Sequence, residues 1–262
     1  MPVILRVAVF LPWCLGFPLP PAKDLEGWDF VKDYFHGFFL SKKELALLTL
    51  ETQTQFLQQF HPNATDLLAP QMTALLRQPH CGGPDGANSS NSSRKSKWNK
   101  HMLTYRIINY PRDMKPSTVK RIILKVVSIW SNVTLLIFQQ VQSENADIKI
   151  SFWKGAHGDD WPFDGPGGVL GHAFLPNSGK SGVVHFDKCE HWSVSNTGFN
   201  LFLVAIHELG HSLGLQHSKN RRSIMYSAYR YRNPRTFRLS VDDIKKIQQQ
   251  YSQCLLEEKK GI

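Results

Sequence analysis

The stretch HELGHSLGLQH at residues 207–217 decides the fold of this chain, and Met225 follows it closely. On an α-helix, His207 and His211 are four residues apart, so both imidazoles leave the same face and can bind one metal ion. Glu208 lies between them, within reach of a water molecule on that ion. Three residues of one straight helix cannot form a tetrahedral corner, so a third ligand has to follow a turn.

Gly214 permits that turn, because a residue without a Cβ atom can adopt a positive φ, end the helix and bring His217 beneath it. Three imidazoles with one open position are the arrangement of a catalytic zinc rather than a closed structural one. A bare HExxH can also arise by chance on a helix. Gly214, His217 and Met225 in register favour metal catalysis, and the apolar run 201–206 predicts a buried, rigid helix.

The length of 262 residues suits one catalytic domain and a smaller appendage, and 42% hydrophobic residues suffice for a core. Residues 1–16 are typical of a secretory signal peptide, because Arg6 precedes an apolar run too short for a membrane anchor. No later stretch is apolar enough to span a bilayer. Glycosylation sequons, which agree with secretion, begin at Asn63, Asn88, Asn91 and Asn132.

The net charge of +10 is distributed along the chain and lacks interleaved aromatic residues. A heparin-binding or nucleic-acid-binding module would need a clustered patch, so this pattern argues against both. It indicates instead a solvated basic surface with an affinity for acidic glycans or cell surfaces.

The cysteine count is informative. Loss of residues 1–16 removes Cys14 and leaves Cys81, Cys189 and Cys254. An odd number in a secreted protein predicts at least one thiol that is free or otherwise engaged.

The segment 17–80 is predicted to form three short amphipathic helices, and 86–100, rich in Gly, Asn, Ser and Lys, is typical of an exposed linker. After the linker the pattern becomes that of an α/β domain. The predicted strands are 103–107, 136–141 and 147–152, and the predicted helix is 116–131. Ser240 and Asp243 form a capping box that begins a last helix, with Ile244, Ile247 and Tyr251 on its buried face.

The segment 155–192 is loop-like but rich in polar ligands. His157, Asp159, His172 and His185 make a plausible tetrahedral structural zinc set. Between them, Asp164 and the following glycines offer a carboxylate and free carbonyls, which Ca²⁺ prefers, and Asp187 and Glu190 can complete that cage. Ordinary loop residues are the alternative. A long loop does need something to hold it, and metal ions would do so.

These stretches together resemble the matrix metalloproteinases, a metzincin family, over nearly the whole chain. The matching stretches are 103–107 (LTYRI), 146–148 (ADI), 161–167 (WPFDGPG), 172–174 (HAF), 185–187 (HFD) and 207–217. The resemblance is greatest to the minimal, matrilysin-type members. It implies a pro-domain at 17–97 with three helices and a cysteine switch, and no haemopexin domain. It also implies an α/β (α+β) zinc-protease domain at 98–262, with a twisted, mostly parallel five-stranded sheet and three helices.

The resemblance identifies Cys81 as the cysteine of the switch, whose thiolate occupies the open zinc position until the pro-domain is removed. Two neighbours depart from the family pattern, since His80 replaces an arginine and Gly83 a valine. In relatives the arginine pairs with the aspartate equivalent to Asp85. A mostly neutral histidine is expected to hold the pro-segment more weakly.

The same resemblance assigns the other metals. The structural zinc falls on His157, Asp159, His172 and His185, and one calcium on Asp164, Gly165, Gly167, Val169, Asp187 and Glu190. A second calcium would use Asp147, Gly179 and Ser181, but Val183 replaces its usual aspartate, so we expect this site to be weak or absent. A third is not expected, because Lys188 and Cys189 replace acidic residues.

The implied function is that of a secreted, zinc-dependent endopeptidase, made as a zymogen, that cleaves extracellular matrix and other extracellular proteins. His207, His211 and His217 hold the zinc, and Glu208 takes a proton from water and delivers it to the departing amine. Substrate lies along an edge strand. One of its side chains enters an apolar pocket near Leu203, Ala173 and Tyr229, whose wall departs from the family at Ser227.

The implied partners are extracellular proteins, including zymogens, and tissue inhibitors of metalloproteinases; nucleic acid is not expected and the chain is expected to be a monomer. The main rival is a secreted binding protein that keeps the fold but has lost turnover. Intact Glu208 and the three zinc histidines argue against it.

Overall fold

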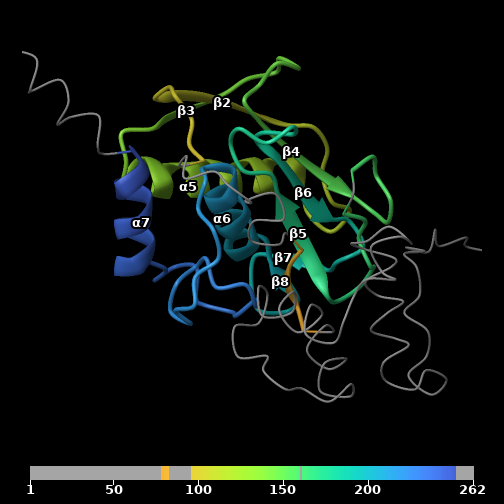
Figure 1. Ribbon diagram of the computed structural model, residues 1–262. Helices are drawn as coiled ribbons and strands as arrows, with labels where there is room; N and C mark the ends of the chain where they lie inside the picture. The colour runs from red at the N-terminus through yellow and green to blue at the C-terminus, as the bar shows by residue number, and fades with distance from the viewer. Residues whose placement is uncertain (1–77, 83–95, 160, 252–262) are drawn as a thin grey trace, which may run out of the picture.

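The computed structural model describes residues 78–82, 96–159 and 161–251 (Figure 1). The predicted signal peptide, the three helices of the pro-domain, most of the linker and Cys254 lie outside the described residues.

A six-stranded sheet, ordered β1-β5-β6-β4-β2-β3, forms the centre of the molecule. Neighbouring strands are parallel except for the antiparallel pair β5–β6. The strands are β1 (His80–Cys81), β2 (Met102–Ile107), β3 (Ile137–Gln140), β4 (Ile148–Trp153), β5 (Val169–Ala173) and β6 (Val183–Asp187). The mostly parallel five-stranded sheet is confirmed in β2 to β6. The additional strand, β1, comes from the segment around Cys81 and covers the edge of β5.

Three helices complete the described part of the fold, as predicted: α5 (Pro116–Ser131), α6 (Leu201–Ser212) and α7 (Val241–Tyr251). Pro116 suits the first turn of α5, where its missing N–H leaves no bond unmade. The buried side chains of α5 recur at helical spacing and end in Trp130, whose indole N–H donates to the Ile206 carbonyl at 3.1 Å. This contact holds α5 beside α6 against the sheet (Figure 1).

The last helix begins at the predicted capping box. The Ser240 N–H donates to Asp243 Oδ2 at 2.9 Å, and the Asp243 N–H donates to Ser240 Oγ at 3.2 Å. Ile247 and Tyr251 are buried, whereas Ile244 is only half-buried. The Tyr251 hydroxyl donates to the Leu213 carbonyl at 2.7 Å, so α7 is attached to the turn that follows α6.

The prediction that 155–192 is loop-like was wrong in part, because β5 and β6 lie within it and the short β7 (Trp192–Ser193) begins at its last residue. β7 pairs in parallel with β8 (Phe199–Asn200). The sequences VLGHA and VVHFD are short and mostly buried, and each carries a histidine that interrupts the apolar run. The alternation that marks a strand with one solvated face is therefore missing. Within the described ranges no helix is long and apolar enough to cross a membrane.

Candidate active site

The helix α6 is buried along its whole length, between α5 and the sheet. Its Gly210 leaves room for a close neighbour, because a Cβ atom there would overlap the Met225 sulfur and lie 3.2 Å from the Trp130 ring. Met225 is fully buried beneath the helix. Met225 and Trp130 therefore pack closely against the helix at Gly210.

The helix ends as the sequence predicted. Gly214 has φ +100°, and a Cβ atom there would overlap the Ser96 carbonyl oxygen. The Leu215 N–H donates to the Gly210 carbonyl at 3.0 Å, which closes the turn. This turn brings His217 next to the histidines of α6.

Backbone carbonyls orient the histidines of α6. His207 Nδ1 lies 2.7 Å from the Ile224 carbonyl oxygen, and His211 Nδ1 lies 2.7 Å from that of Leu215. A carbonyl oxygen only accepts, so each Nδ1 carries the proton and each Nε2 presents a lone pair. Burial lowers the pKa of His211 strongly, and the neighbouring His217 and His207 lower it further, so this ring is neutral.

The lone pairs converge. His211 Nε2 lies 3.0 Å from His207 Nε2 and 3.2 Å from His217 Nε2. Two unprotonated nitrogens at that distance repel each other unless a cation lies between them. Zn–N bonds of about 2.1 Å give a tetrahedral edge of about 3.4 Å. The three nitrogens thus fit a zinc ion.

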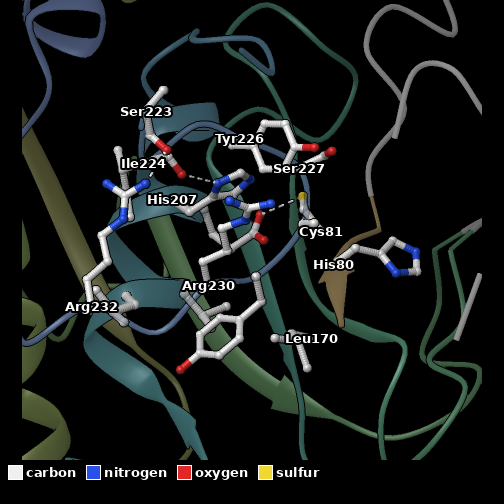
Figure 2. A pocket seen from close by; sticks show the side chains of 15 residues that line it. His80, Cys81, Leu170, His207, Ser223, Ile224, Tyr226, Ser227, Arg230 and Arg232 are labelled. Carbon is white, nitrogen blue, oxygen red and sulfur yellow. Dashed lines mark hydrogen bonds between the residues drawn. The ribbon is translucent and has the colours of Figure 1, made fainter. Parts of the chain in front are cut away.

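Cys81 closes the fourth side. Its sulfur and the three nitrogens all lie within 4.8 Å of one another. The thiol is 4% exposed and donates to Glu208 Oε2 at 3.5 Å, a contact drawn as a dashed line in Figure 2. The structure therefore brings the predicted switch cysteine together with the predicted zinc ligands.

Backbone hydrogen bonds hold the segment 79–82 on both sides. The N–H groups of His80 and Gly82 donate to β5 and its lead-in, at the carbonyls of Gly168 and Gly171, both at 2.8 Å. On the other side, the Cys81 N–H donates to the Ser227 carbonyl at 3.1 Å, and the Tyr229 N–H donates to the Pro79 carbonyl at 2.8 Å. The segment thus occupies a groove between the edge of β5 and residues 227–229.

His80 contributes no positive charge to this groove. Its side chain is buried, and burial lowers its pKa to about 4. Nδ1 lies 2.5 Å from the Gln78 carbonyl oxygen, so it donates to its own segment. Asp85, the expected partner of the family arginine, lies outside the described residues.

Glu208 is fully buried, and burial raises its pKa to about 8, partly offset by the hydrogen bond from Cys81. Its Oε1 atom has no hydrogen-bond partner within the described part of the chain. Desolvation of the charged form is the cause of the shift. One oxygen of this carboxyl group is therefore available to a water molecule or a substrate.

A pocket extends from this site beside α6. Leu203 and Tyr229 line it as predicted, and Ser227 contributes to its wall. Ala173 is not among its lining residues; it lies at the end of β5, paired with Val184. The lining also includes Arg230 and Arg232, which the expectation of an apolar pocket did not consider (Figure 2).

A second cluster brings together His157, Asp159, His172 and His185, whose ligand atoms also lie within 4.8 Å of one another. Nitrogens of the three rings surround one oxygen, Asp159 Oδ2, at 2.9 to 3.1 Å. Burial raises the pKa of Asp159, but hydrogen bonds to the three rings outweigh it and hold that pKa well below its usual range. Burial lowers the pKa of His172 to about 4. Three imidazoles and a carboxylate fit a closed tetrahedral ion.

A third group is looser and contains the carboxyl groups of Asp164, Asp187 and Glu190. All three are buried, and burial raises their pKa values to about 8, 7 and 8; repulsion by neighbouring carboxylates adds to the shift of Asp164 and Glu190. Backbone N–H groups of the predicted ligands bind them: Gly165 donates to Asp187 at 3.2 Å, Gly167 to Glu190 at 2.7 Å and Val169 to Asp164 at 3.1 Å. These carboxyl groups are not among the described sets with all ligand atoms within 4.8 Å.

Asp147, the carboxylate expected for a second calcium, has other partners. It lies 2.6 Å from Lys100 Nζ and accepts from the backbone and hydroxyl of Thr104 at 2.7 and 2.8 Å. These protein donors compensate the negative charge of Asp147 without a metal ion.

The residues that orient His207 were not predicted. Asp243 is fully buried and accepts from the Ile224 N–H at 3.0 Å and from the Ser223 hydroxyl. It thereby fixes the backbone whose Ile224 carbonyl binds His207. The capping box revealed Asp243 only as a helix cap, because nothing in the local pattern shows its contact with residues 223–224.

Comparisons with known proteins agree with this geometry. The profile of the matrixin family matches residues 97–252. Human matrix metalloproteinase-26 is 70% identical over 251 residues, covering 96% of each chain. Human matrilysin is 39% identical over 255 residues, covering 95% of each chain. Rat macrophage metalloelastase is 45% identical over 232 residues, which are 85% of this chain but only 50% of that protein. The matrixin family uses zinc, and the chain belongs to it as a metalloendopeptidase of the matrix metalloproteinase type.

Proposed function

We propose that this chain is a secreted endopeptidase, made as a zymogen, that cleaves extracellular matrix and other extracellular proteins with a zinc ion held by His207, His211 and His217. The observation that carries the proposal is the convergence of the three Nε2 atoms beside a buried Glu208 carboxyl group. Tissue inhibitors of metalloproteinases are proposed as partners, and a monomer as the working form.

Bound at the three imidazoles, zinc supplies Lewis-acid polarisation of the peptide carbonyl and acidifies a water molecule. Glu208 lies beside this position with one oxygen unpartnered. It takes the proton of the attacking water and delivers it to the departing amine. The carbonyls of Ile224 and Leu215 keep two rings in the tautomer that presents Nε2.

In the latent form, Cys81 occupies the side on which water would enter. Burial raises the pKa of Glu208 to about 8, so this carboxyl group tends to hold a proton near neutral pH. Removal of the segment 79–82 admits water to Glu208 and lowers the cost of its charged form. The contact with Cys81 blocks the site, and the burial of Glu208 keeps its carboxyl group protonated, a shift that the hydrogen bond from Cys81 offsets only in part.

The backbone groups that hold segment 79–82 define the substrate groove. β5 is the edge strand once β1 leaves, and it offers the Gly168 and Gly171 carbonyls to an extended peptide. Residues Ser227 and Tyr229 offer one acceptor and one donor from the other side. A substrate side chain between them enters the pocket lined by Leu203.

The remaining metals are proposed as structural. His157, Asp159, His172 and His185 would hold a second zinc, and the site is closed because every position is filled by protein. Asp164, Asp187 and Glu190, with carbonyls of Gly165, Gly167 and Val169, would hold calcium. A cation would remove the mutual repulsion of three buried carboxyl groups.

The test uses the full chain, activated by limited proteolysis and identified by its new N-terminus. We expect chelator-sensitive cleavage of a quenched gelatin-derived peptide. The Glu208→Ala variant should retain zinc but lose activity by about 10³-fold or more. Glu144→Ala, at a carboxylate 91% exposed, is the matched control and should keep full activity. Equal rates for the Glu208→Ala variant and the parent would refute the proposal.

A further inference from the structure

The pocket beside Glu208 combines apolar walls with positive charge. Leu170, Leu203 and Val204 supply apolar surface, whereas Arg230 and Arg232 contribute two guanidinium groups. Among the described residues that line it, Glu208 is the one acidic residue. A purely apolar pocket, suited to leucine, would carry no such charges.

Arg232 is a fixed charge in this wall. Its guanidinium donates to the carbonyls of Arg222 at 2.8 Å, Ser223 at 2.9 Å and Arg221 at 3.3 Å. Burial lowers its pKa, the carboxylate of Asp243 raises it, and the charge of Arg230 lowers it. A guanidinium stays protonated at physiological pH all the same. Its donors are largely used, so Arg232 acts on a ligand through its charge.

Arg230 is the exposed partner. Its guanidinium carbon lies 5.3 Å from the centre of the Tyr226 ring, and Figure 2 draws its side chain against the pocket. No carboxylate among the described residues forms an ion pair with it. Its N–H donors are thus free to bind a ligand, and the ring restricts where the group can lie.

We propose that Arg230, supported by the fixed charge of Arg232, makes this pocket favour an acidic substrate side chain over its uncharged isostere, glutamate over glutamine, at the residue directly after the scissile bond. The inference rests on the proposed endopeptidase activity. The methylenes of glutamate pack against Leu203 and Val204, and its carboxylate binds the Arg230 guanidinium. A lysine in this position meets two positive charges and, in the described lining of the pocket, no carboxylate other than Glu208.

The backbone contacts of the groove lie directly beside Arg230 in the sequence. The Ser227 carbonyl and the Tyr229 N–H hold the backbone of the segment 79–82, and Arg230 follows Tyr229 directly. A substrate that forms hydrogen bonds with the same backbone groups therefore lies next to Arg230, because this arginine directly follows Tyr229. This proximity favours direct binding of a substrate carboxylate by Arg230 over a general attraction by the net charge of +10.

The experiment measures kcat/KM for peptides that differ only in having glutamate, glutamine, leucine or lysine after the scissile bond. The full chain is activated by limited proteolysis, as are Arg230→Leu, Arg230→Glu and the control Arg235→Leu, an exposed arginine of the same loop outside the pocket. Glutamate and glutamine have the same shape, so their ratio isolates charge. We expect glutamate to exceed glutamine by about fivefold, with a smaller ratio at high salt.

In Arg230→Leu the ratio should fall to about one, and Arg230→Glu should favour the lysine peptide over the glutamine peptide. Such a reversal could not come from a misfolded variant. Arg235→Leu should keep the ratio of the parent. An unchanged ratio in Arg230→Leu, or an equal decrease in Arg235→Leu, would overturn the inference while cleavage of the leucine peptide still supports the protease. Absence of chelator-sensitive cleavage of every peptide would overturn both.

Discussion

The molecule contains two clusters of histidine ligand atoms, which differ in what surrounds them. His207, His211 and His217 come from one buried helix and its turn, and a thiol from another segment of the chain lies on their fourth side. His157, Asp159, His172 and His185 come from strands and a loop, and all four positions belong to one continuous segment. If the proposed pro-segment is removed, the first cluster loses its fourth group, whereas the second keeps all four.

The difference also concerns what holds the side chains. In the first cluster, carbonyls of Ile224 and Leu215 orient the rings without any ion. In the second, a backbone carbonyl, that of Gly155, holds only His157, and all three rings share the single oxygen Asp159 Oδ2. We infer that the first site is organised by the protein and binds zinc for chemistry, whereas the second is organised by its ion and holds the loop in place.

Replacement of His211 by alanine should have the largest effect, and it should be on activity. The variant should bind one zinc fewer than the parent and lose activity by about 10³-fold or more, because two imidazoles bind zinc weakly. Zinc analysis and peptide cleavage measure both. His101→Ala, at an exposed histidine, is the control. If the His211 variant retained its zinc, the assignment of the open site would be wrong.

Replacement of His172 by alanine should act on stability instead. The change leaves Asp159 buried with fewer partners and removes one of the four proposed zinc ligands. We expect the free energy of unfolding to fall by about 3 kcal/mol. Urea unfolding of the zinc-loaded proteins measures this. The comparison between the clusters fails if the His172 variant unfolds like the parent, or if His211→Ala is destabilised as much.

Asp243→Ala tests whether the protein itself organises the first cluster. The change removes the acceptor of the Ile224 N–H and of two serine hydroxyls, so we expect a loss of about 2 kcal/mol in the free energy of unfolding. Zinc affinity should fall about tenfold, as for other residues that orient a ligand. Stability is measured on the zinc-free chain. A destabilisation seen only with zinc present would contradict the model of a preorganised site.

The sequence predicted the helix and turn of the first cluster better than the strands within residues 155–192. Helical period and the conformational freedom of Gly214 are local properties, so the spacing within 207–217 predicts both the fold and the ligand set. The strands β5 and β6 are short and largely buried, and β6 also pairs with β4, a strand that precedes the whole predicted loop. No short-range pattern could indicate that they interrupt the predicted loop.

Contacts between distant segments were equally beyond a local pattern. The pairing of β1 with β5 and the contact of Asp243 with residues 223–224 each join segments at least nineteen residues apart. The arginines of the pocket were visible as charges in the sequence. Their position beside Leu203 depends on how the chain turns after Met225.

Asp147→Asn should have the smallest effect and sharpens the contrast between carboxylates held by protein and those proposed to need an ion. Lys100 and Thr104 hold the pKa of Asp147 below its usual value despite partial burial. A carboxylate with a lowered pKa stabilises the fold above its unfolded pKa of about 3.9 and loses that contribution as pH falls further. We expect the variant to be less stable by about 1 kcal/mol from pH 7 to 5, with a smaller difference below pH 4, in urea unfolding with and without calcium. A difference that disappeared when calcium was removed would make Asp147 a metal ligand after all, because the bonds from Lys100 and Thr104 need no ion.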